Sequence, residues 1–138
     1  MREASKRAMS ELLRICRPGE HTLVAAATDS SALGVLDAVR EAGLEAHFAI
    51  VGQDCIPEVM EEMRRGTSAI VGSISHEPET YGPRLIQLGI AILRGYTVPP
   101  YNYVHHKAVT PETLGDEAKV HNARREDGAL VEQEVGRQ

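Results

Sequence analysis

The sequence predicts an α/β fold, an open and mostly parallel sheet with flanking helices. The main observation is a regular alternation along the chain. Segments with apolar residues at helical spacing take turns with short, continuous apolar runs of the kind found in buried strands. This order implies parallel strands joined by right-handed crossovers, with helices on the faces of the sheet. The length of 138 residues suits one domain, and 42% apolar against 25% charged residues is typical of a globular protein.

The expected elements follow in order from these patterns. Apolar residues at helical spacing predict helices over about residues 3–16, 29–42, 57–65 and 81–93. Apolar or β-branched runs predict strands over 21–28, 46–52 and 68–75, and a strand-like segment over 98–109. The first strand lacks alternation, which predicts that both of its faces are covered. Residues 1–114 therefore form the expected domain, and the charged, thinly apolar residues 115–138 are expected to be a loose tail.

Capping residues support the expected helix starts. Asp29 or Ser30 is placed to cap the second helix, and Thr80 is a possible cap for the last one. Pro57 is acceptable in the first turn of its helix, because the N–H groups there have no partner within the helix.

Composition disfavours several kinds of partner. The net charge is −5 and the basic residues are scattered, which disfavours nucleic acid as a partner. No apolar run is long enough to span a bilayer, and the first residues, MREASKRAMSELL, lack the apolar stretch of a secretory signal. The chain as written is therefore expected in the cytoplasm unless a leader has been removed. Cys16 and Cys55 form no CxxC pair, so neither a disulfide framework nor a zinc site is indicated, and no cofactor is expected.

The carboxyl ends of parallel strands are the expected binding edge of such a sheet. Three turns are predicted to lie along this edge. They hold Thr28 and Asp29 after the first strand, Gln53 to Cys55 after the second, and Ser75 to Glu77 after the third. The central turn lies in the stretch AIVGQDCIPEVM, where an acid and a thiol directly follow a buried strand.

The sequence disfavours three other kinds of chemistry at this edge. A phosphate-accepting receiver domain would need two acids after its first strand to hold magnesium, and only Asp29 stands there. A metal site from Asp29, Asp54, Cys55 and His76 has no spacing signal. A nucleophile pair of Cys55 and His76 lacks an orienting third group, so no enzyme is expected.

Each candidate residue also has a plain structural interpretation. Asp29 fits a helix cap better than a ligand contact. Asp54 is expected to bind a ligand, although it could also cap the helix that contains Pro57. His76 is either a polar turn residue or part of the site.

Four stretches together resemble the type I periplasmic binding proteins, and more closely the sugar-binding components of ABC importers in the ribose-binding group. They are ATDSSALGVLDAVREAG, IVGQDCIPEVMEEMRRG, SAIVGSISHEPETYG and ILRGYTVPPYNYV. The resemblance covers about residues 9–114 in consistent order. It is specific for the superfamily and less so for the ligand, and the lactose-repressor family of regulators shares the same lobes.

The resemblance implies roles for particular residues. Asp54 matches the aspartate that accepts hydrogen bonds from sugar hydroxyls, Thr28 stands where the family commonly has a ligand-binding asparagine, and His76 falls where a polar residue completes the site. Asp29 and Gln53 are secondary candidates for ligand binding or helix capping. The Thr28 hydroxyl is shorter than an asparagine amide and cannot bind a ligand through two separate groups. Gln53 and Cys55 also replace the usual neighbours of the aspartate, so the resemblance leaves the identity of the solute open.

The resemblance covers only the C-terminal portion of the family, a partial second lobe. It implies a sugar or similar polar solute as ligand, an ABC permease as partner of the full-length parent, and a periplasmic or extracytoplasmic location for that parent. In the family the helix over 81–93 packs on the other lobe, so here its apolar stripe is expected to be uncovered. We expect a homo-oligomer that forms through this stripe, with exchanged terminal elements as one arrangement. The alternative hypothesis is a cytoplasmic regulatory or protein-interaction module that reuses this half-fold, as a remnant of a lactose-repressor-like effector domain.

Overall fold

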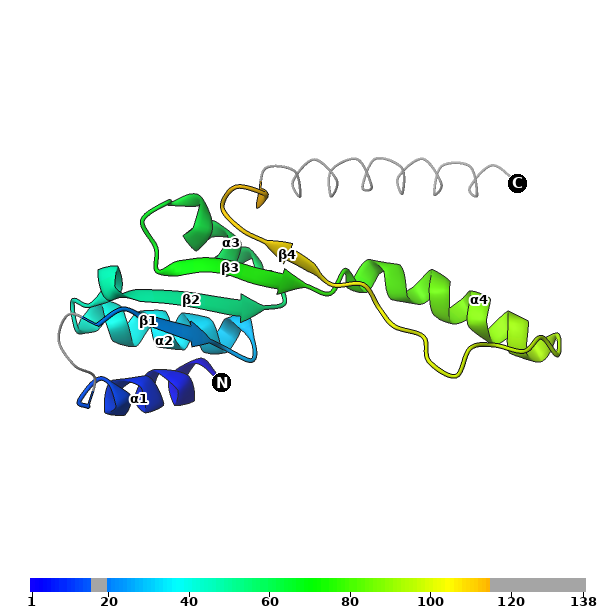
Figure 1. Cartoon of the computed structure of the whole chain (residues 1–138), viewed down its shortest axis with the longest axis horizontal. Coiled ribbons are helices and arrows are strands. Elements are labelled where there is room, and N and C mark those ends of the chain that lie inside the picture. The colour runs from blue at the N-terminus through cyan, green and yellow to red at the C-terminus, as the bar shows by residue number, and fades with distance from the viewer. Residues whose placement is uncertain (16–19, 115–138) are drawn as a thin grey trace, which may run out of the picture.

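The computed structural model describes residues 1–15 and 20–114. Figure 1 shows the order of its elements along the chain. The helices are α1 (Arg2–Leu12), α2 (Asp29–Glu41), α3 (Pro57–Arg64) and α4 (Tyr81–Leu93), with short 3-10 turns η1 (Glu45–His47) and η2 (Pro78–Thr80). The strands are β1 (Thr22–Ala25), β2 (Phe48–Gln53), β3 (Ile70–Ser75) and β4 (Lys107–Val109). Cys16 and the expected tail over 115–138 lie outside the described residues.

The strands form one sheet in the order β1-β2-β3-β4. The first three are parallel, with Thr22 beside Phe48 and Ile50 beside Ile70. β4 runs antiparallel to β3. An open, mostly parallel α/β sheet is therefore confirmed. The expected strand over 98–109 was too long, because only its last three residues reach the sheet.

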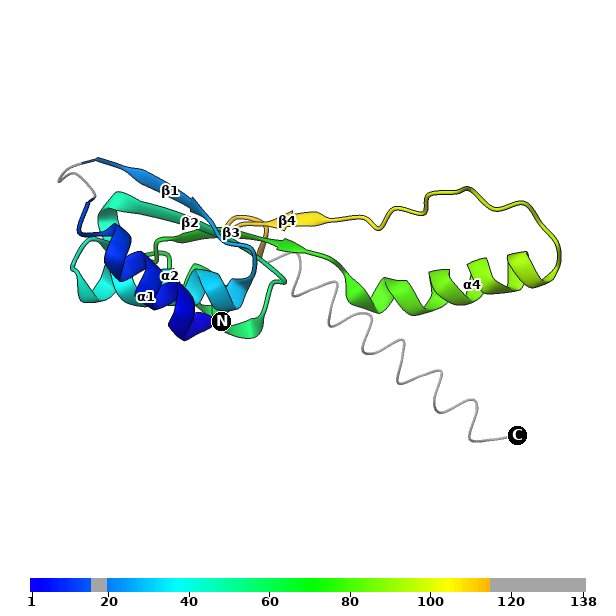
Figure 2. The same cartoon turned by 90° about the horizontal axis from the view of Figure 1, so that it is seen from below.

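One face of the sheet is covered by helices (Figure 2). α2 packs on β2, α3 packs on β3, and α1 lies along α2. Gly34 allows the close contact between α1 and α2, since a Cβ there would lie 2.2 Å from the backbone oxygen of Arg2. The apolar core between these layers includes Leu36, Val39, Ile50, Val59, Met63 and Ile70, all 2% exposed or less.

The opposite face of the sheet is open within the described residues. Leu23 on β1 is 70% exposed, whereas the alternate residues Thr22 and Val24 are half-buried. The expectation that this strand is covered on both faces is therefore wrong for residues 1–15 and 20–114. The physical reason is that all the packed helices lie on the other side, and that β1 is an edge strand of the described sheet.

An arm projects from the sheet at the end of β3 (Figures 1 and 2). The arm consists of η2, α4 and the segment 94–106, which runs back beside α4 to β4. No residue of α4 is buried, and the exposed apolar residues of the arm are Leu85, Ile86, Ile90, Ile92, Leu93, Tyr96, Tyr101, Tyr103 and Val104. The expected uncovered stripe of this helix is thus present. None of the described helices is long and apolar enough to cross a bilayer.

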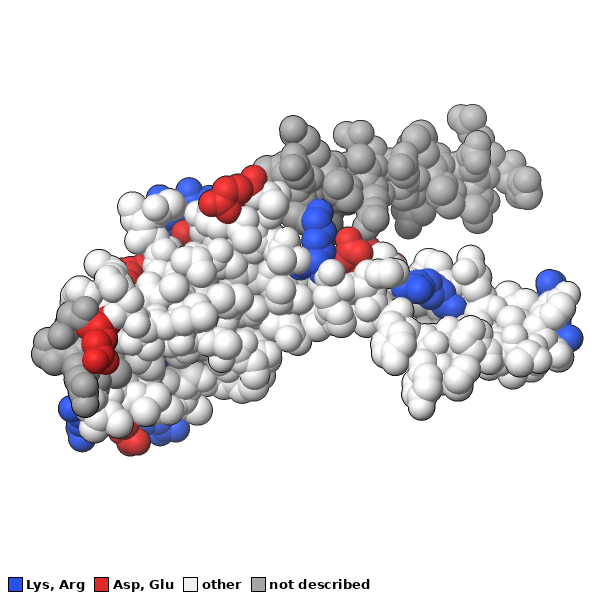
Figure 3. All heavy atoms as spheres, in the orientation of Figure 1, with Lys and Arg blue, Asp and Glu red and all other residues white. Residues whose placement is uncertain are grey.

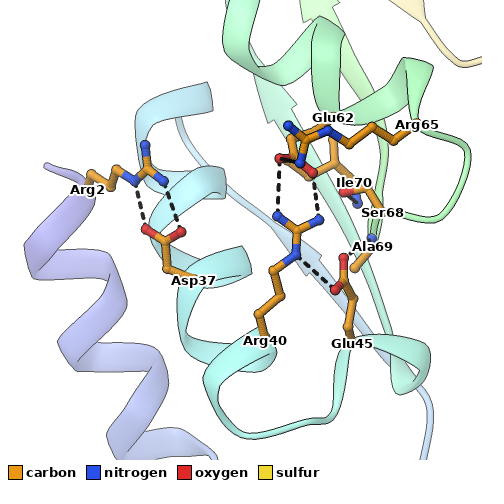
Figure 4. Close-up of polar contacts among 9 residues, drawn as sticks. All are labelled: Arg2, Asp37, Arg40, Glu45, Glu62, Arg65, Ser68, Ala69 and Ile70. Carbon is orange, nitrogen blue, oxygen red and sulfur yellow. Dashed lines mark hydrogen bonds and ion pairs between the residues drawn. The ribbon is translucent and has the colours of Figure 1, made fainter.

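A cluster of ion pairs joins α2 to η1 and α3 (Figure 4). Arg40 on α2 donates to both carboxylate oxygens of Glu62 on α3, at 3.1 and 2.6 Å, and to Glu45 at 2.9 Å. Glu45 also accepts from the backbone N–H of Ala69 at 3.1 Å. Hydrogen bonds from Arg40 hold the pKa of both carboxyl groups below their ordinary values, and the two acids raise the pKa of the guanidinium.

Candidate functional site

The turn after β2 has an unusual backbone that projects Asp54 outward. Asp54 has φ 115° and Cys55 has φ 55°, a region that favours glycine. The backbone N–H of Asp54 donates to Ile74 at 2.9 Å, and that of Cys55 donates to the hydroxyl of Ser73 at 3.1 Å. With its backbone fixed to β3, the turn leaves the Asp54 side chain 42% exposed at the carboxyl end of the sheet.

Asp29 is the buried support of this turn. Its side chain is fully buried, with one carboxylate oxygen accepting from the Ser73 hydroxyl at 2.7 Å and the other from the Ile56 N–H at 2.8 Å. The expectation that Asp29 caps its own helix is wrong, because the Asp29 side chain turns inward to the N-terminus of α3 instead. A cap for α3 from Asp54 is likewise not what the structure shows, since Asp29 receives the Ile56 N–H.

Thr28 is the residue that caps α2. Its hydroxyl oxygen accepts from the Ser31 N–H at 3.2 Å, and its O–H lies 3.2 Å from the Ser31 hydroxyl. Thr28 is half-buried at the edge where it was predicted to bind a ligand. Capping therefore occupies part of the hydrogen-bonding capacity of this side chain.

His76 follows β3 and lies beside Asp54. Its Nε2 is 3.7 Å from Asp54 Oδ1, beyond an ordinary hydrogen bond. The strand ends thus bring together two of the three residues that the sequence predicted as ligand-binding. Gln53, the half-buried last residue of β2, pairs in register with Ile74. Thr80, the other expected cap, makes no side-chain cap for α4 and donates instead to the Glu77 carbonyl at 2.8 Å.

His106 is a member of this cluster that sequence reasoning missed. Its ring packs edge to face on that of His76, with centroids 4.7 Å apart. Ser75 pairs with Lys107 in the antiparallel ladder, so the next positions outward are His76 and His106. The antiparallel pairing of β4 with β3 is what brings His106 beside His76. The sequence pattern predicted a longer strand over 98–109 and gave no direction for its pairing.

The chemistry of the cluster is that of hydrogen bonding. The Asp54 carboxylate accepts hydrogen bonds, and a neutral imidazole offers one donor and one acceptor. Among residues 1–15 and 20–114, no three His, Cys, Asp or Glu side chains are grouped so that they could hold a metal ion. A hollow of about 420 Å³ lies elsewhere, between α4 and the returning segment, and is lined by Tyr81, Arg84, Leu85, Gln87, Leu88, Asn102, Tyr103 and Val104. It contains none of the predicted ligand residues.

Solved structures of periplasmic binding proteins share this fold. The fructose-binding periplasmic domain of a hybrid two-component system matches with a TM-score of 0.80 and 22% identity, over 99% of this chain and 45% of its own. An Agrobacterium vitis ABC transporter solute-binding protein with bound allitol has a TM-score of 0.76 and 22% identity, over 86% and 41%. The binding protein of a Shewanella arabinose ABC transporter, bound to L-arabinofuranose, has a TM-score of 0.70 and 24% identity, over 96% and 43%.

These comparisons establish the fold of the chain. It has the α/β fold of a part of the type I periplasmic binding proteins, which confirms the resemblance noted in the sequence. It spans less than half the length of each of the three structures. No protein-family model matches the sequence, and no curated protein matches it significantly.

Proposed function

We propose that this chain is the C-terminal portion of a non-catalytic binding protein for a monosaccharide or a related polyol. The observation that carries the proposal is the position of Asp54. A left-handed turn holds its half-exposed carboxylate at the carboxyl edge of the sheet, 3.7 Å from His76. The similar solved structures include proteins bound to allitol and to L-arabinofuranose, both rich in hydroxyl groups.

Asp54 would accept hydrogen bonds from two adjacent hydroxyls of the solute. A carboxylate suits this role because it has two oxygens and makes strong, charge-assisted bonds. His76 and Gln53 would add neutral donors and acceptors beside it. Thr28 would contribute one weaker contact, because its hydroxyl also caps α2. Asp29 acts indirectly, by fixing the turn.

Affinity of the 138-residue chain alone should be weak. Solute pockets of high affinity enclose most of the ligand, and enclosure excludes the water that competes for each hydroxyl. This chain supplies one edge of such a site and spans less than half of the similar structures. We therefore expect dissociation constants of about 1 mM or weaker.

The direct test is an NMR titration of the ¹⁵N-labelled chain with D-fructose, L-arabinose and allitol. The expected result is a set of shifts confined to the turns after β1, β2 and β3. Asp54→Asn should remove most of the response to the best binder. Glu41→Gln is the matched control, since Glu41 ends the same helix that Thr28 caps, about 20 Å from Thr28 at 1.5 Å per residue. Saturation at micromolar solute would show that the one-edge picture of the site is incomplete.

The parent of this chain is proposed to serve an ABC permease outside the cytoplasm. The alternative use of the same site is regulation, and one observation favours it: the fructose-binding neighbour belongs to a hybrid two-component system. The discriminating observation is the genomic neighbourhood. Adjacent permease and ATPase genes would support import, whereas an adjacent sensor-kinase or an independent start at Met1 would support a regulatory module.

We also propose that two copies of this chain associate through α4. The arm carries few charges, and its surface in Figure 3 is mostly white; Arg84 and Arg94 are the only Lys or Arg residues of segment 81–106, which has no Asp or Glu. An isologous contact of two such helices would cover both apolar stripes at once. If the chain is a piece of a longer protein, the remainder of that protein is the competing occupant.

Light scattering on the eluting chain tests this association at 20 to 100 micromolar. A dimer that Ile86→Asp converts to monomer supports the proposal. Leu23→Lys is the matched control, because Leu23 is similarly exposed but lies on the sheet. A monomer at all concentrations would favour the remainder of a longer protein as the partner of α4.

A further inference from the structure

Two histidines meet at the amino ends of β1 and β2. His21 directly precedes β1, and His47 directly precedes β2. Thr22 and Phe48 are in register in this parallel pair, so the two histidines are neighbours across the strands. Their ring centres lie 5.5 Å apart, and the ring planes are inclined at 44°. This end of the sheet lies opposite the arm (Figure 1).

One nitrogen of this histidine pair has no partner. Nδ1 of His47 is buried, and it is the only buried side-chain nitrogen or oxygen in residues 1–15 and 20–114 that makes no hydrogen bond. Buried polar atoms in proteins nearly always have a partner, and an exception calls for an explanation such as a bound water or ion. The ring that the structure places beside His47 is that of His21, which offers nitrogen atoms of its own.

We propose that His21 and His47 together bind a divalent cation of the borderline class, Zn²⁺, Ni²⁺ or Cu²⁺. Each histidine supplies one imidazole nitrogen, which for His47 is Nδ1, and water molecules fill the remaining coordination positions. Imidazole suits these three ions, whereas Mg²⁺ and Ca²⁺ prefer oxygen ligands. The site does not depend on the proposed function, because it lies at the opposite ends of the strands from Asp54.

The distance between the rings fits a single shared ion. With a metal–nitrogen bond of about 2.1 Å, the ion lies about 3.2 Å from each ring centre, and a tetrahedral angle at the ion separates the two centres by about 5.2 Å. The observed separation is 5.5 Å. The inclination of 44° also differs from a face-to-face stack, in which the nitrogens of the two rings could not point at one position.

An ion can reach this pair from solvent. His21 is exposed, and side chains alternate along a strand, so His21 lies on the same open face of the sheet as Leu23, which is 70% exposed. The exposed His21 ring can rotate to admit an ion beside His47. Segments 20–28 and 41–56, which contain the two histidines, have no Lys or Arg, and the net charge of the chain is −5. Both features favour the approach of a cation.

A bound ion joins an edge strand to its neighbour. β1 has only four residues and pairs with β2 alone in the described sheet. The two histidines are 26 positions apart in sequence, and folding brings them together. An ion that binds both therefore favours the folded chain over the unfolded one and stabilises the sheet at the β1 edge.

The test is a calorimetric titration of the 138-residue chain, without a polyhistidine tag, with Zn²⁺ at pH 7.5. We expect one ion per chain and a dissociation constant of about 1 to 100 micromolar, because only two of the usual four ligands come from the protein. His21→Gln should weaken binding about tenfold or more, and His47→Gln should do the same. His21→Gln is the main variant, because His21 is exposed and the substitution should leave the fold intact.

The matched control is His106→Gln. His106 also belongs to a histidine pair, with its ring centre 4.7 Å from that of His76, so its substitution tests whether any such pair binds the ion. Zinc affinity should stay within about twofold of the parent value in this variant. Affinity that falls in His106→Gln and persists in His21→Gln would overturn the proposed site. Half an ion per chain would place the ion between two copies and would also overturn it.

Two further measurements locate the ion and its effect. Paramagnetic Cu²⁺ at less than one equivalent should broaden the amide signals of Thr22 and Phe48 and leave those of residues 53–55 sharp. Zn²⁺ should raise the thermal unfolding midpoint of the parent chain and leave that of His21→Gln unchanged. Absence of zinc binding, or broadening confined to the His76 edge, would overturn the proposal. If zinc binds as expected but no sugar binds, the metal site stands and the proposed function fails.

Discussion

The carboxylate of Asp29 lies 2.7 Å from the hydroxyl of Ser73, a residue 44 positions further along the chain. Both side chains are buried, and the second oxygen of Asp29 receives the N–H of Ile56. One carboxylate therefore joins the starts of α2 and α3 to the middle of β3. The Ser73 hydroxyl in turn receives the N–H of Cys55, so this bond sets the shape of the turn that presents Asp54.

Asp29→Asn should destabilise the protein more than its small change in size suggests. The amide would turn its NH₂ toward one of two donors and leave a buried group without a partner, at a cost of about 1 to 3 kcal/mol in the free energy of unfolding. Urea denaturation followed by circular dichroism measures this cost. Asp37→Asn, which weakens a partly exposed pair with Arg2, is the control and should cost about 1 kcal/mol or less. Similar effects of the two substitutions would contradict the buried role of Asp29.

Gly34→Ala should destabilise the contact of α1 with α2. Alanine normally improves a helix interior by about 1 kcal/mol, but here its Cβ would meet the backbone of α1 at 2.2 Å. Hydrogen exchange of α1 should accelerate and the unfolding midpoint should fall. Gly89→Ala in α4 is a matched control, since nothing lies within 4 Å of its Cβ position, and it should be neutral or stabilising. Equal results at both glycines would mean that α1 does not dock as described.

Asp54→Gly should increase the stability of the protein while it removes sugar binding. The φ of 115° is costly for aspartate and free for glycine, so the substitution should raise the free energy of unfolding by about 1 kcal/mol. It also deletes the proposed hydroxyl acceptor, so the response to sugars should vanish. Cys55→Gly, at φ 55°, should be neutral or stabilising without the loss of binding. Chemical denaturation and the sugar titration, run on both variants, give the two readouts.

Acid should destabilise the protein through Glu45 and Glu62. Hydrogen bonds from Arg40 hold the pKa of each folded carboxyl below its ordinary value of 4.5. A lowered pKa means that this stabilisation is complete above about pH 4.5 and is lost as pH falls through the lower folded values. Unfolding free energies measured between pH 6 and 3 should therefore decline.

Removal of the Arg40 guanidinium tests this assignment of the acid sensitivity to Glu45 and Glu62. Arg40→Gln should lower stability at pH 6 by about 1 to 2 kcal/mol, a figure that allows for the partial exposure of the arginine, and should flatten the decline toward pH 3. Arg64→Gln is the control, because Arg64 pairs only loosely with exposed Glu61, at 3.6 Å. A decline that stays as steep in Arg40→Gln would assign the acid sensitivity to other carboxyl groups.

The helices and parallel strands were predictable because their signals are local. Val59 and Met63 repeat at helical spacing, and the runs that contain Ile50 and Ile70 are apolar and short. The edge that carries Asp54 followed from the general rule for parallel sheets. What could not be predicted depends on distant contacts. An aspartate before a helix signals a cap, but the partner of Asp29 was Ile56, 27 residues away.

The returning segment shows the same limit. Val98 to Val109 has a strand-like composition, but most of it runs beside α4, where no neighbouring strand is paired with it in the described structure. Only the last three residues reach a partner. The contact of His106 with His76 depends on this short ladder and on its antiparallel direction, and neither can be predicted from the local sequence.

The arm leaves and re-enters the body through two neighbouring strands, β3 and β4, which are hydrogen-bonded to each other. A force on the arm therefore acts on both strands, and sliding β3 past β4 would break the hydrogen bonds between them. The backbone of Glu77, at φ 47°, lies between β3 and η2, where the chain leaves the sheet for the arm. A molecule bound to α4 would therefore hold a segment whose two ends join the sheet side by side, at the edge that carries His76.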